Sequence, residues 1–429
     1  MIFEIQTWMK IFEFASQMPG KDIFMMFWFL LLFEVPRYAL SFPGLVMMYR
    51  ESHKAKGMPR IPDGIGKVSI LIAGHNEADA IEHGVLSLKK QSFKDFEIVC
   101  VSDGSTDATY EIMKRLQREG LVDKIAGNAI RGGKASAINL AARLASGDIL
   151  IVIDCDCTFE THAIAEMLTP FEDPLVAGVS ASVLVKNGDA SFIASLQGIE
   201  YLSGMVLGKA QMDVMDQLTM ISGAFGAFRR TAWDRVNGMD PGPGEDLDIS
   251  LRLRFAGYKL AFAHRAVAYT DVPTTLFNLF RQRNRWERDS LWLRFRKHSF
   301  LMNPFDHRFS FREVKHQWDF TIFTLISTAI FPIYMVFCYL WLQTSFLPIM
   351  AIAAVMTLTL DFFVFCCAVI ASGNKNHWRY LPFVFVYGLF QSYVMRMHRL
   401  WSFSAELIYS VSRHDSFAPP KVNDWIRWK

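Results

Sequence analysis

Two aspartates, Asp154 and Asp156, directly follow an apolar run at 148–153 (DILIVI). Carboxylates at the end of a buried strand can hold a hard divalent cation such as Mg²⁺ or Mn²⁺, which would then bridge to a diphosphate. The thiols of Cys155 and Cys157 suggest zinc instead, but alternation along an extended chain directs them away from the aspartates. The pair therefore predicts a metal site with oxygen ligands.

Two further polar clusters follow apolar runs in the same way. Asn76 and Glu77 come after the run at 68–73, and Asp103 comes after the run at 96–101. Each cluster alone is a weak signal, because Asp-Gly-Ser is also a common turn. Parallel sheets bind ligands at the carboxyl ends of their strands. The three clusters together predict one binding rim.

The elements that must position these clusters alternate between strand and helix. The three apolar runs are typical of buried parallel strands. Helical patterns follow at 78–90, 106–118 and 135–144, and Ser105 or Asp107 can cap the second. Such alternation predicts an α/β fold with a doubly wound, Rossmann-like sheet.

A basic, glycine-rich loop, Arg131-Gly132-Gly133-Lys134, precedes the third of these helices. Its backbone amides and cations are suited to a phosphate group, and a simple turn fits the same residues equally well. The chain lacks both G-x-x-x-x-G-K-[ST] and a strand–G-x-G-x-x-G–helix pattern. The sequence therefore lacks the main motif expected of a nucleoside triphosphatase and that expected of a dehydrogenase.

A second acidic pair, Glu245 and Asp246, follows the glycine-rich loop 242–244 and opens a helical stretch. Acids are favoured in the first turn of a helix, so capping alone can explain them. The alternative is a general base near the metal site, because a carboxylate can accept the proton of a reacting hydroxyl.

The segment 281–286 (RQRNRW) concentrates three arginines around Gln282 and ends at Trp286. Arg281, Arg283 and Arg285 need anionic partners, either lipid headgroups or a diphosphate. The flat face of Trp286 suits stacking on a sugar ring, and an aromatic anchor at the membrane surface is the alternative.

The composition predicts a mixed protein with one soluble domain and a few membrane spans. Of the 429 residues, 52% are hydrophobic, and the mean hydropathy is +0.18. The net charge of +3 gives no reason to expect a nucleic-acid partner. The six cysteines have neither the spacing of a disulfide framework nor that of a zinc knuckle.

Apolar segments lie toward both ends of the chain. They run over 23–48, 320–342 and 346–371, and a last one begins near Leu381 and is interrupted by Arg396, His398 and Arg399. Each of the first three is long enough for a span. Inside the first, Glu34 and Arg37 either meet on one helical face or flank a kink at Pro36.

Basic stretches at 48–60, 281–297 and 375–379 place the central domain in the cytosol by the positive-inside rule. The N-terminal residues 1–15 predict an amphipathic helix on the membrane and not a signal peptide. After Trp286, apolar residues alternate with arginines, which predicts a helix lying on the inner leaflet. The alternating residues are Leu291, Trp292 and Phe295 with Arg288, Arg294 and Arg296.

These patterns divide the chain into five parts. The predicted parts are an amphipathic helix and first span (1–50), a cytosolic catalytic domain (51–286), interfacial helices (287–317), a region of about three spans (318–411) and a short tail (412–429). The predicted location is the plasma (inner) membrane, as an integral multi-pass protein.

The motifs together resemble those of the membrane-bound, inverting family 2 glycosyltransferases, which include the synthases of cellulose, hyaluronan, chitin oligosaccharides and poly-N-acetylglucosamine. The resemblance covers about 67–286. It rests on Asn76-Glu77, Asp103, Gly132 to Lys134, Asp154 with Asp156, Asp246, and Gln282 to Trp286. Gly74 departs from the pattern, since a proline is common there.

The resemblance implies a GT-A fold, a UDP-sugar donor and a role for each matching residue. Asp246 would be the general base beside Glu245, and Asp154 and Asp156 would hold Mg²⁺ or Mn²⁺. Asp103 would contact the uridine, and Trp286 and Gly223 would contact the acceptor. The other implied donor contacts are Asn76, Glu77, Gly133, Lys134, Asp154, Gln282, Arg283 and Arg285.

The implied activity is inverting transfer of a hexose, glucose or N-acetylglucosamine, to a growing β-linked polysaccharide at the cytosolic membrane face. The implied partners are the UDP-sugar, a carbohydrate acceptor and membrane lipids, with no nucleic acid. The few spans leave room for a homo-oligomer or an export partner. Two alternatives stay open: transfer of one sugar to a membrane lipid, and a transporter or channel whose central domain only binds nucleotides.

Overall fold

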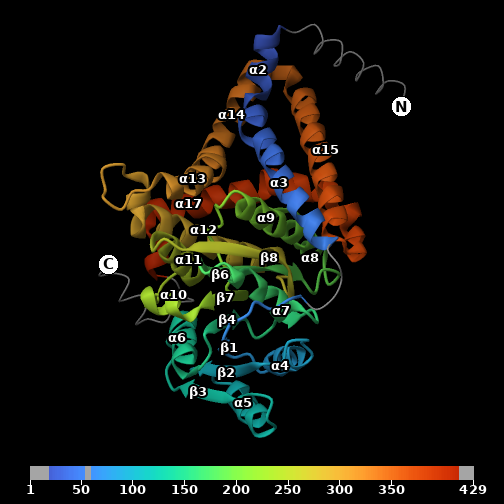
Figure 1. Cartoon of the computed structure of the whole chain (residues 1–429). Coiled ribbons are helices and arrows are strands. Elements are labelled where there is room, and N and C mark those ends of the chain that lie inside the picture. Colours follow the sequence, from blue (N-terminus) through green and yellow to red (C-terminus); the bar gives the residue numbers. More distant parts are fainter. Residues whose placement is uncertain (1–18, 54–58, 415–429) are drawn as a thin grey trace.

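The computed structural model describes residues 19–53 and 59–414. The predicted N-terminal amphipathic helix and nearly all of the predicted tail lie outside these ranges. Figure 1 shows a sheet with helices on both faces, and a group of long helices, including α2, α14 and α15, that extends from one side of it.

The sheet has eight strands in the order β3-β2-β1-β4-β7-β6-β8-β5. Their bounds are β1 Val68–Gly74, β2 Phe96–Asp103, β3 Lys124–Asn128, β4 Ile149–Ile153, β5 Thr158–Phe159, β6 Val176–Val185, β7 Phe225–Arg229 and β8 Lys259–Thr270. The three predicted strands are confirmed as β1, β2 and β4, and they pair in parallel. Beyond β4 the sheet is mixed, because β7 runs antiparallel to both β4 and β6.

Alternation along the first strands supplies two cores, one on each face of the sheet. Ile70 and Ile72 of β1 pack on one face with helices α4 (Ile81–Lys89) and α5 (Thr109–Arg118). Leu71 packs on the other face with α6 (Lys134–Leu144). Burial on both faces explains why these strands are continuously apolar.

The three predicted helices are confirmed as α4, α5 and α6; the first two begin three residues later than expected, and the third begins at Lys134, one residue earlier. Asn76 adopts a positive φ of 57°, and its carboxamide accepts the N–H of Thr106 at 2.8 Å. This turn delays α4 until Ile81. Asp107 accepts the N–H of Thr109 at 3.0 Å and so stabilises the start of α5.

The second half of the domain adds helices that cover the mixed part of the sheet. These are α7 Ala163–Leu168, α8 Phe192–Ile199, α9 Leu207–Val214, α10 Arg230–Arg235, α11 Glu245–Phe255 and α12 Leu276–Trp292. The helical segment 200–206 joins α8 to α9. Figure 1 shows α9 between the sheet and α3 (Val35–Ser52), so this half of the domain lies next to the long helices.

Among the described residues, two helical segments are long and apolar enough to cross a membrane, Gly20–Ser52 and Phe311–Ser372. The first combines α2 (Gly20–Phe29) with α3, and Glu34 and Arg37 approach to 4.0 Å on one face. The second begins with α13 (Phe311–Asp319) and turns back between α14 (Ser327–Leu342) and α15 (Phe346–Ser372). Only 28% and 17% of their most apolar windows are buried, unlike the core helices of a soluble domain.

The last predicted span is not among these segments. Its residues form α16 (Val384–Leu389) and α17 (Arg396–Tyr409), and α17 lies across the base of the long helices in Figure 1. Arg399 of α17 pairs with Glu287 of α12 at 2.8 Å. The number of spans therefore stays a prediction.

The basic segment after Trp286 is partly enclosed by the rest of the protein. Arg288 and Arg294 are buried, with only 8% and 6% of their surface exposed. Arg294 donates to Gln317 Oε1 at 3.0 Å and lies over the Phe320 ring. Arg294 therefore packs against α13 and the helical segment that follows it, and the interfacial position of residues 287–317 stays a prediction.

Candidate active site

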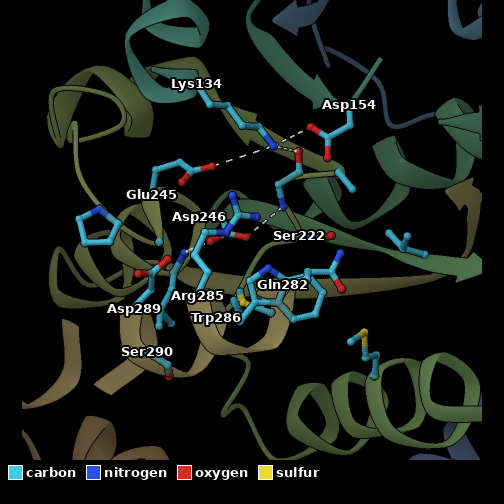
Figure 2. A pocket seen from close by; sticks show the side chains of 18 of the residues that line it. Lys134, Asp154, Ser222, Glu245, Asp246, Gln282, Arg285, Trp286, Asp289 and Ser290 are labelled. Atoms are coloured by element: carbon cyan, nitrogen blue, oxygen red, sulfur yellow. Dashed lines mark hydrogen bonds and ion pairs between the residues drawn. The ribbon is translucent and has the colours of Figure 1, made fainter. Parts of the chain in front are cut away.

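A cavity of about 750 Å³ opens where the strand ends meet α11 and α12. Most of the predicted site residues line it: Gly133, Lys134, Asp154, Asp156, Gly223, Glu245, Asp246, Gln282, Arg285 and Trp286. Figure 2 shows Lys134 and Asp154 on one side and Gln282, Arg285 and Trp286 on the other, with Asp246 between them. Asn76, Glu77, Asp103 and Arg283 lie outside the lining.

Lys134 joins the two acidic clusters. Its ammonium donates to Asp154 Oδ1 at 2.6 Å and to the carbonyl of Gly223 at 3.2 Å, and it lies 4.0 Å from Glu245 Oε1. Burial alone would lower the pKa of Lys134, but the charges of Asp154 and Glu245 more than offset it and raise the pKa. Lys134 is therefore a fixed positive charge inside the cavity.

The buried Asp103 holds the glycine loop in front of Lys134. Its carboxylate accepts the N–H groups of Gly132 at 2.8 Å and Gly133 at 2.7 Å. Gly133 has a φ of 90°, a conformation that favours glycine. Asp103 thus holds the conformation of this glycine loop, and both phosphate binding by the loop and the contact of Asp103 with uridine stay predictions.

Asp154 and Asp156 bring two carboxylates to the cavity lining, close to Glu77. Burial, then the charge of Asp154, raises the pKa of Asp156. Burial, then the charges of Asp156 and Asp154, raises the pKa of Glu77 to about 7. Such crowding of negative charge favours a divalent cation.

A group of three His, Cys, Asp or Glu ligands does not occur among the described residues. Diphosphate oxygens and water would therefore have to complete a cation site at Asp154 and Asp156. Cys155 and Cys157 are buried outside the cavity lining, and burial raises the pKa of both thiols.

The second acidic pair begins α11. Asp246 accepts the N–H of Leu247 at 2.8 Å and that of Gly223 at 3.3 Å, so its carboxylate has a fixed orientation. A Cβ on Gly223 would lie 3.2 Å from Lys134 Nζ and 3.3 Å from Asp246 Oδ2. Because Gly223 has no side chain, Lys134 and Asp246 can both lie close to its backbone. Burial raises the pKa of Glu245, which Lys134 opposes and Asp246 reinforces.

Buried ion pairs fix the helix that carries Asp246. Arg254, near the end of α11, forms a two-point pair with Glu313 of α13, at 2.6 and 3.0 Å. Asp248, one turn into α11, contacts His298 at 2.9 Å and Lys297 at 2.8 Å. These contacts join α11 to α13 and to the segment 297–298.

The arginine-rich segment lies in α12, whose first turn is capped by Thr275, which accepts the N–H of Asn278 at 3.3 Å. Gln282, Arg285 and Trp286 line the cavity. Arg283 is buried and pairs with Glu200 at 2.9 Å. A protein carboxylate is thus the anionic partner that the sequence predicted as lipid or diphosphate, and the role of Arg283 in donor binding stays a prediction.

Sequence reasoning missed the opposite wall of the cavity. This wall comes from the segment 200–206 and α9, and it contains Tyr201, Gly204, Met205, Gly208, Lys209 and Met212. Lys209 donates to Ser180 Oγ of β6 at 3.0 Å. These residues belong to no motif, and the isolated lysine in an apolar stretch is the one signal that could have revealed them.

Residues 69–236 match the family model described as glycosyl transferase family 2. A poly-beta-1,6-N-acetyl-D-glucosamine synthase of Staphylococcus aureus (strain MSSA476) is 29% identical over 226 residues, which are 52% of this chain and 54% of the relative. The synthase of Staphylococcus epidermidis is 27% identical over 286 residues, which are 66% of each chain. The chain thus spans about half to two thirds of the curated relatives it matches.

A solved structure also shares the fold. The mannosyltransferase PcManGT from Pyrobaculum calidifontis, in complex with GDP-Man and Mn²⁺, aligns with a TM-score of 0.58 over 86% of this chain and 97% of its own. The sequence identity is 17%, so this likeness establishes the fold alone. The predicted α/β GT-A fold is confirmed.

Proposed function

Because residues 69–236 match the model of glycosyl transferase family 2, we propose that the chain transfers a sugar from a UDP-sugar to a growing β-linked polysaccharide. The donor sugar is glucose or N-acetylglucosamine. One observation carries the proposal: Asp246, Lys134 and the Asp154–Asp156 pair line a single cavity. A base and a diphosphate site in one cavity are what direct transfer requires. A protein that only binds nucleotides needs no base.

Asp246 acts as the general base. Its two oxygens accept backbone N–H groups from Leu247 and Gly223, which keep the carboxylate directed into the cavity. It takes the proton of the acceptor hydroxyl while that oxygen attacks the anomeric carbon. Attack opposite the leaving diphosphate inverts the anomeric centre in one displacement. An α-linked donor thus gives a β-linked product, and no covalent enzyme intermediate is required.

The donor end of the cavity stabilises the leaving diphosphate. Lys134 supplies a fixed charge, and Arg285 lines the same space from α12. Asp154 and Asp156 would hold Mg²⁺ or Mn²⁺, which neutralises charge on phosphate oxygens when bound. Trp286 presents an aromatic surface beside these groups, which suits stacking on a sugar ring. Its ring is braced by Arg283, whose guanidinium lies 4.2 Å from the ring centroid.

A membrane location fits this chemistry. The two candidate spans extend from the same side of the domain (Figure 1), and α9 on the cavity wall packs against α3 of the first. A cytosolic domain would meet the nucleotide-sugar there, at the inner membrane. We propose that export of the product uses further helices in addition to the two described candidate segments. A second copy or an export partner could supply them.

The test is UDP release by the purified full chain in detergent or lipid nanodiscs. UDP-glucose, UDP-N-acetylglucosamine and other donors are compared with and without Mg²⁺ or Mn²⁺. We expect one donor to release UDP and to give a ladder of products on a gel. A single-sugar product would support transfer to a lipid acceptor instead. No UDP release from any donor would contradict the proposal.

A further inference from the structure

Lys209 is a cavity-lining cation without a carboxylate partner. It lies on α9 and shares the cavity wall with Gly204, Gly208 and Met212. Among the described ranges, no Asp or Glu comes within ion-pair distance of its ammonium, which donates a hydrogen bond to Ser180 Oγ at 3.0 Å. An ammonium group has three donors, so two are left for a ligand in the cavity.

Short contacts connect Lys209 to the proposed base. Ser180 Oγ, which accepts from Lys209, also accepts the N–H of Ser222 at 3.1 Å. The next residue, Gly223, donates its N–H to Asp246. The charge of Asp246 also acts on the pKa of Lys209. The ammonium is therefore near the place where the acceptor hydroxyl must bind.

The wall around Lys209 offers space and little other polarity. A Cβ on Gly208 would meet no atom within 4 Å, and one on Gly204 would meet only Glu200 Cγ at 3.8 Å. Met205 and Met212 contribute apolar surface. Glycine and methionine surfaces suit a sugar ring, and Lys209 is the group on α9 that can respond to the charge of what binds.

We propose that Lys209 determines which acceptor sugars the cavity binds; this inference rests on the proposed function. Its ammonium donates hydrogen bonds to a hydroxyl or acetamido oxygen of a neutral acceptor sugar and excludes an acceptor sugar that carries an ammonium group. Two like charges a few ångström apart repel strongly in a site shielded from water. The acceptor class is therefore neutral or N-acetylated sugars, and a free amino sugar is rejected.

The test compares two acceptors on the full chain, the methyl β-glycosides of N-acetylglucosamine and of glucosamine. Transfer to each is measured at about pH 6.5, where alkylammonium groups are charged. We expect the wild type to prefer the acetylated acceptor by about tenfold or more, from like-charge repulsion. Lys209→Met should bring the ratio close to one by admitting the amino sugar, and Lys209→Arg should keep the preference.

The matched control is Lys259→Gln, which removes a lysine that is ion-paired to Asp173 and lies outside the cavity lining. Its acceptor ratio should equal that of the wild type. An unchanged ratio in Lys209→Met would overturn the inference, as would a wild type that uses both acceptors equally. If Lys209→Met does not fold, Lys209→Gln gives the same readout. No transfer by the wild type to any acceptor would instead overturn the proposed function itself.

Discussion

Two lysines reach into the same cavity and meet opposite surroundings. Lys134 contacts Asp154 and Glu245, and these charges raise its pKa above the ordinary value. Lys209 contacts a serine, and burial lowers its pKa to about 8, which the charge of Asp246 only partly opposes. The residue type is the same, so the difference comes from the neighbouring carboxylates. They stabilise the charged form of Lys134, whereas burial without such partners destabilises the charged form of Lys209.

The two walls that carry these lysines differ in the same way. The donor wall comes from loops after parallel strands and is dense in charge, as a diphosphate and a cation require. The opposite wall comes from helices and combines one cation with glycines and methionines. A charged ligand and a largely neutral one would therefore occupy different walls of one cavity.

The most direct test of the difference between the two walls is to remove the charge of Asp246, which lies between them. Asp246→Asn keeps the shape of the side chain, and its one remaining oxygen can still accept the N–H of Leu247, at the cost of the longer bond from Gly223. We expect transfer to fall by roughly 10²- to 10⁴-fold, the usual contribution of a general base. Donor affinity should change little, because Lys134 and Asp154 are untouched. UDP release and donor binding by calorimetry check this, and an equal loss of both would contradict the assignment.

A smaller effect is expected when the donor wall alone is changed. Asp156→Ala should weaken donor binding in Mg²⁺ or Mn²⁺ by about 10- to 100-fold, as loss of metal-site groups commonly does. Calorimetric titration with and without the metal measures it. Asp173→Asn, at an exposed ion pair with Lys259, is the control. If the wild type binds donor equally well in a chelator, the metal assignment fails.

The sequence predicted the first half of the domain well, for a local reason. The strands β1, β2 and β4 are buried on both faces, and burial leaves a continuous apolar run that can be read directly. Asp154 and Asp156, directly after β4, line the cavity as predicted, whereas Asn76, Glu77 and Asp103, after β1 and β2, lie outside its lining.

The second half escaped prediction because its signals are not local. β6 is buried throughout, yet it is rich in alanine, glycine and serine, which are weak strand formers. Its mixed pairing with β7 and β8 depends on residues far along the chain. Likewise, Arg283 forms an ion pair with Glu200, 83 residues away in the sequence. Ser180 contacts Lys209 only because α9 packs over the sheet.

The smallest predicted effect concerns stability and should have opposite signs for the two lysines. With a folded pKa of about 8 and an unfolded value of about 10.4, Lys209 binds fewer protons when folded, so stability rises with pH across that window. Below about pH 8 its charge costs stability. Lys209→Met should therefore raise the midpoint of thermal unfolding at neutral pH by about 2 °C, and this gain should shrink toward about pH 10.

Lys134→Met should lower the midpoint instead, because it leaves Asp154 and Glu245 without their shared cation. Because its pKa is raised, Lys134 stays charged across the neutral range, and its contribution to stability is lost only at strongly alkaline pH. Midpoints of both variants measured from about pH 7 to about pH 10 test the pair together. A shift of the same sign in both variants would show that packing volume outweighs charge at these positions. The contrast between the two walls would then not be electrostatic.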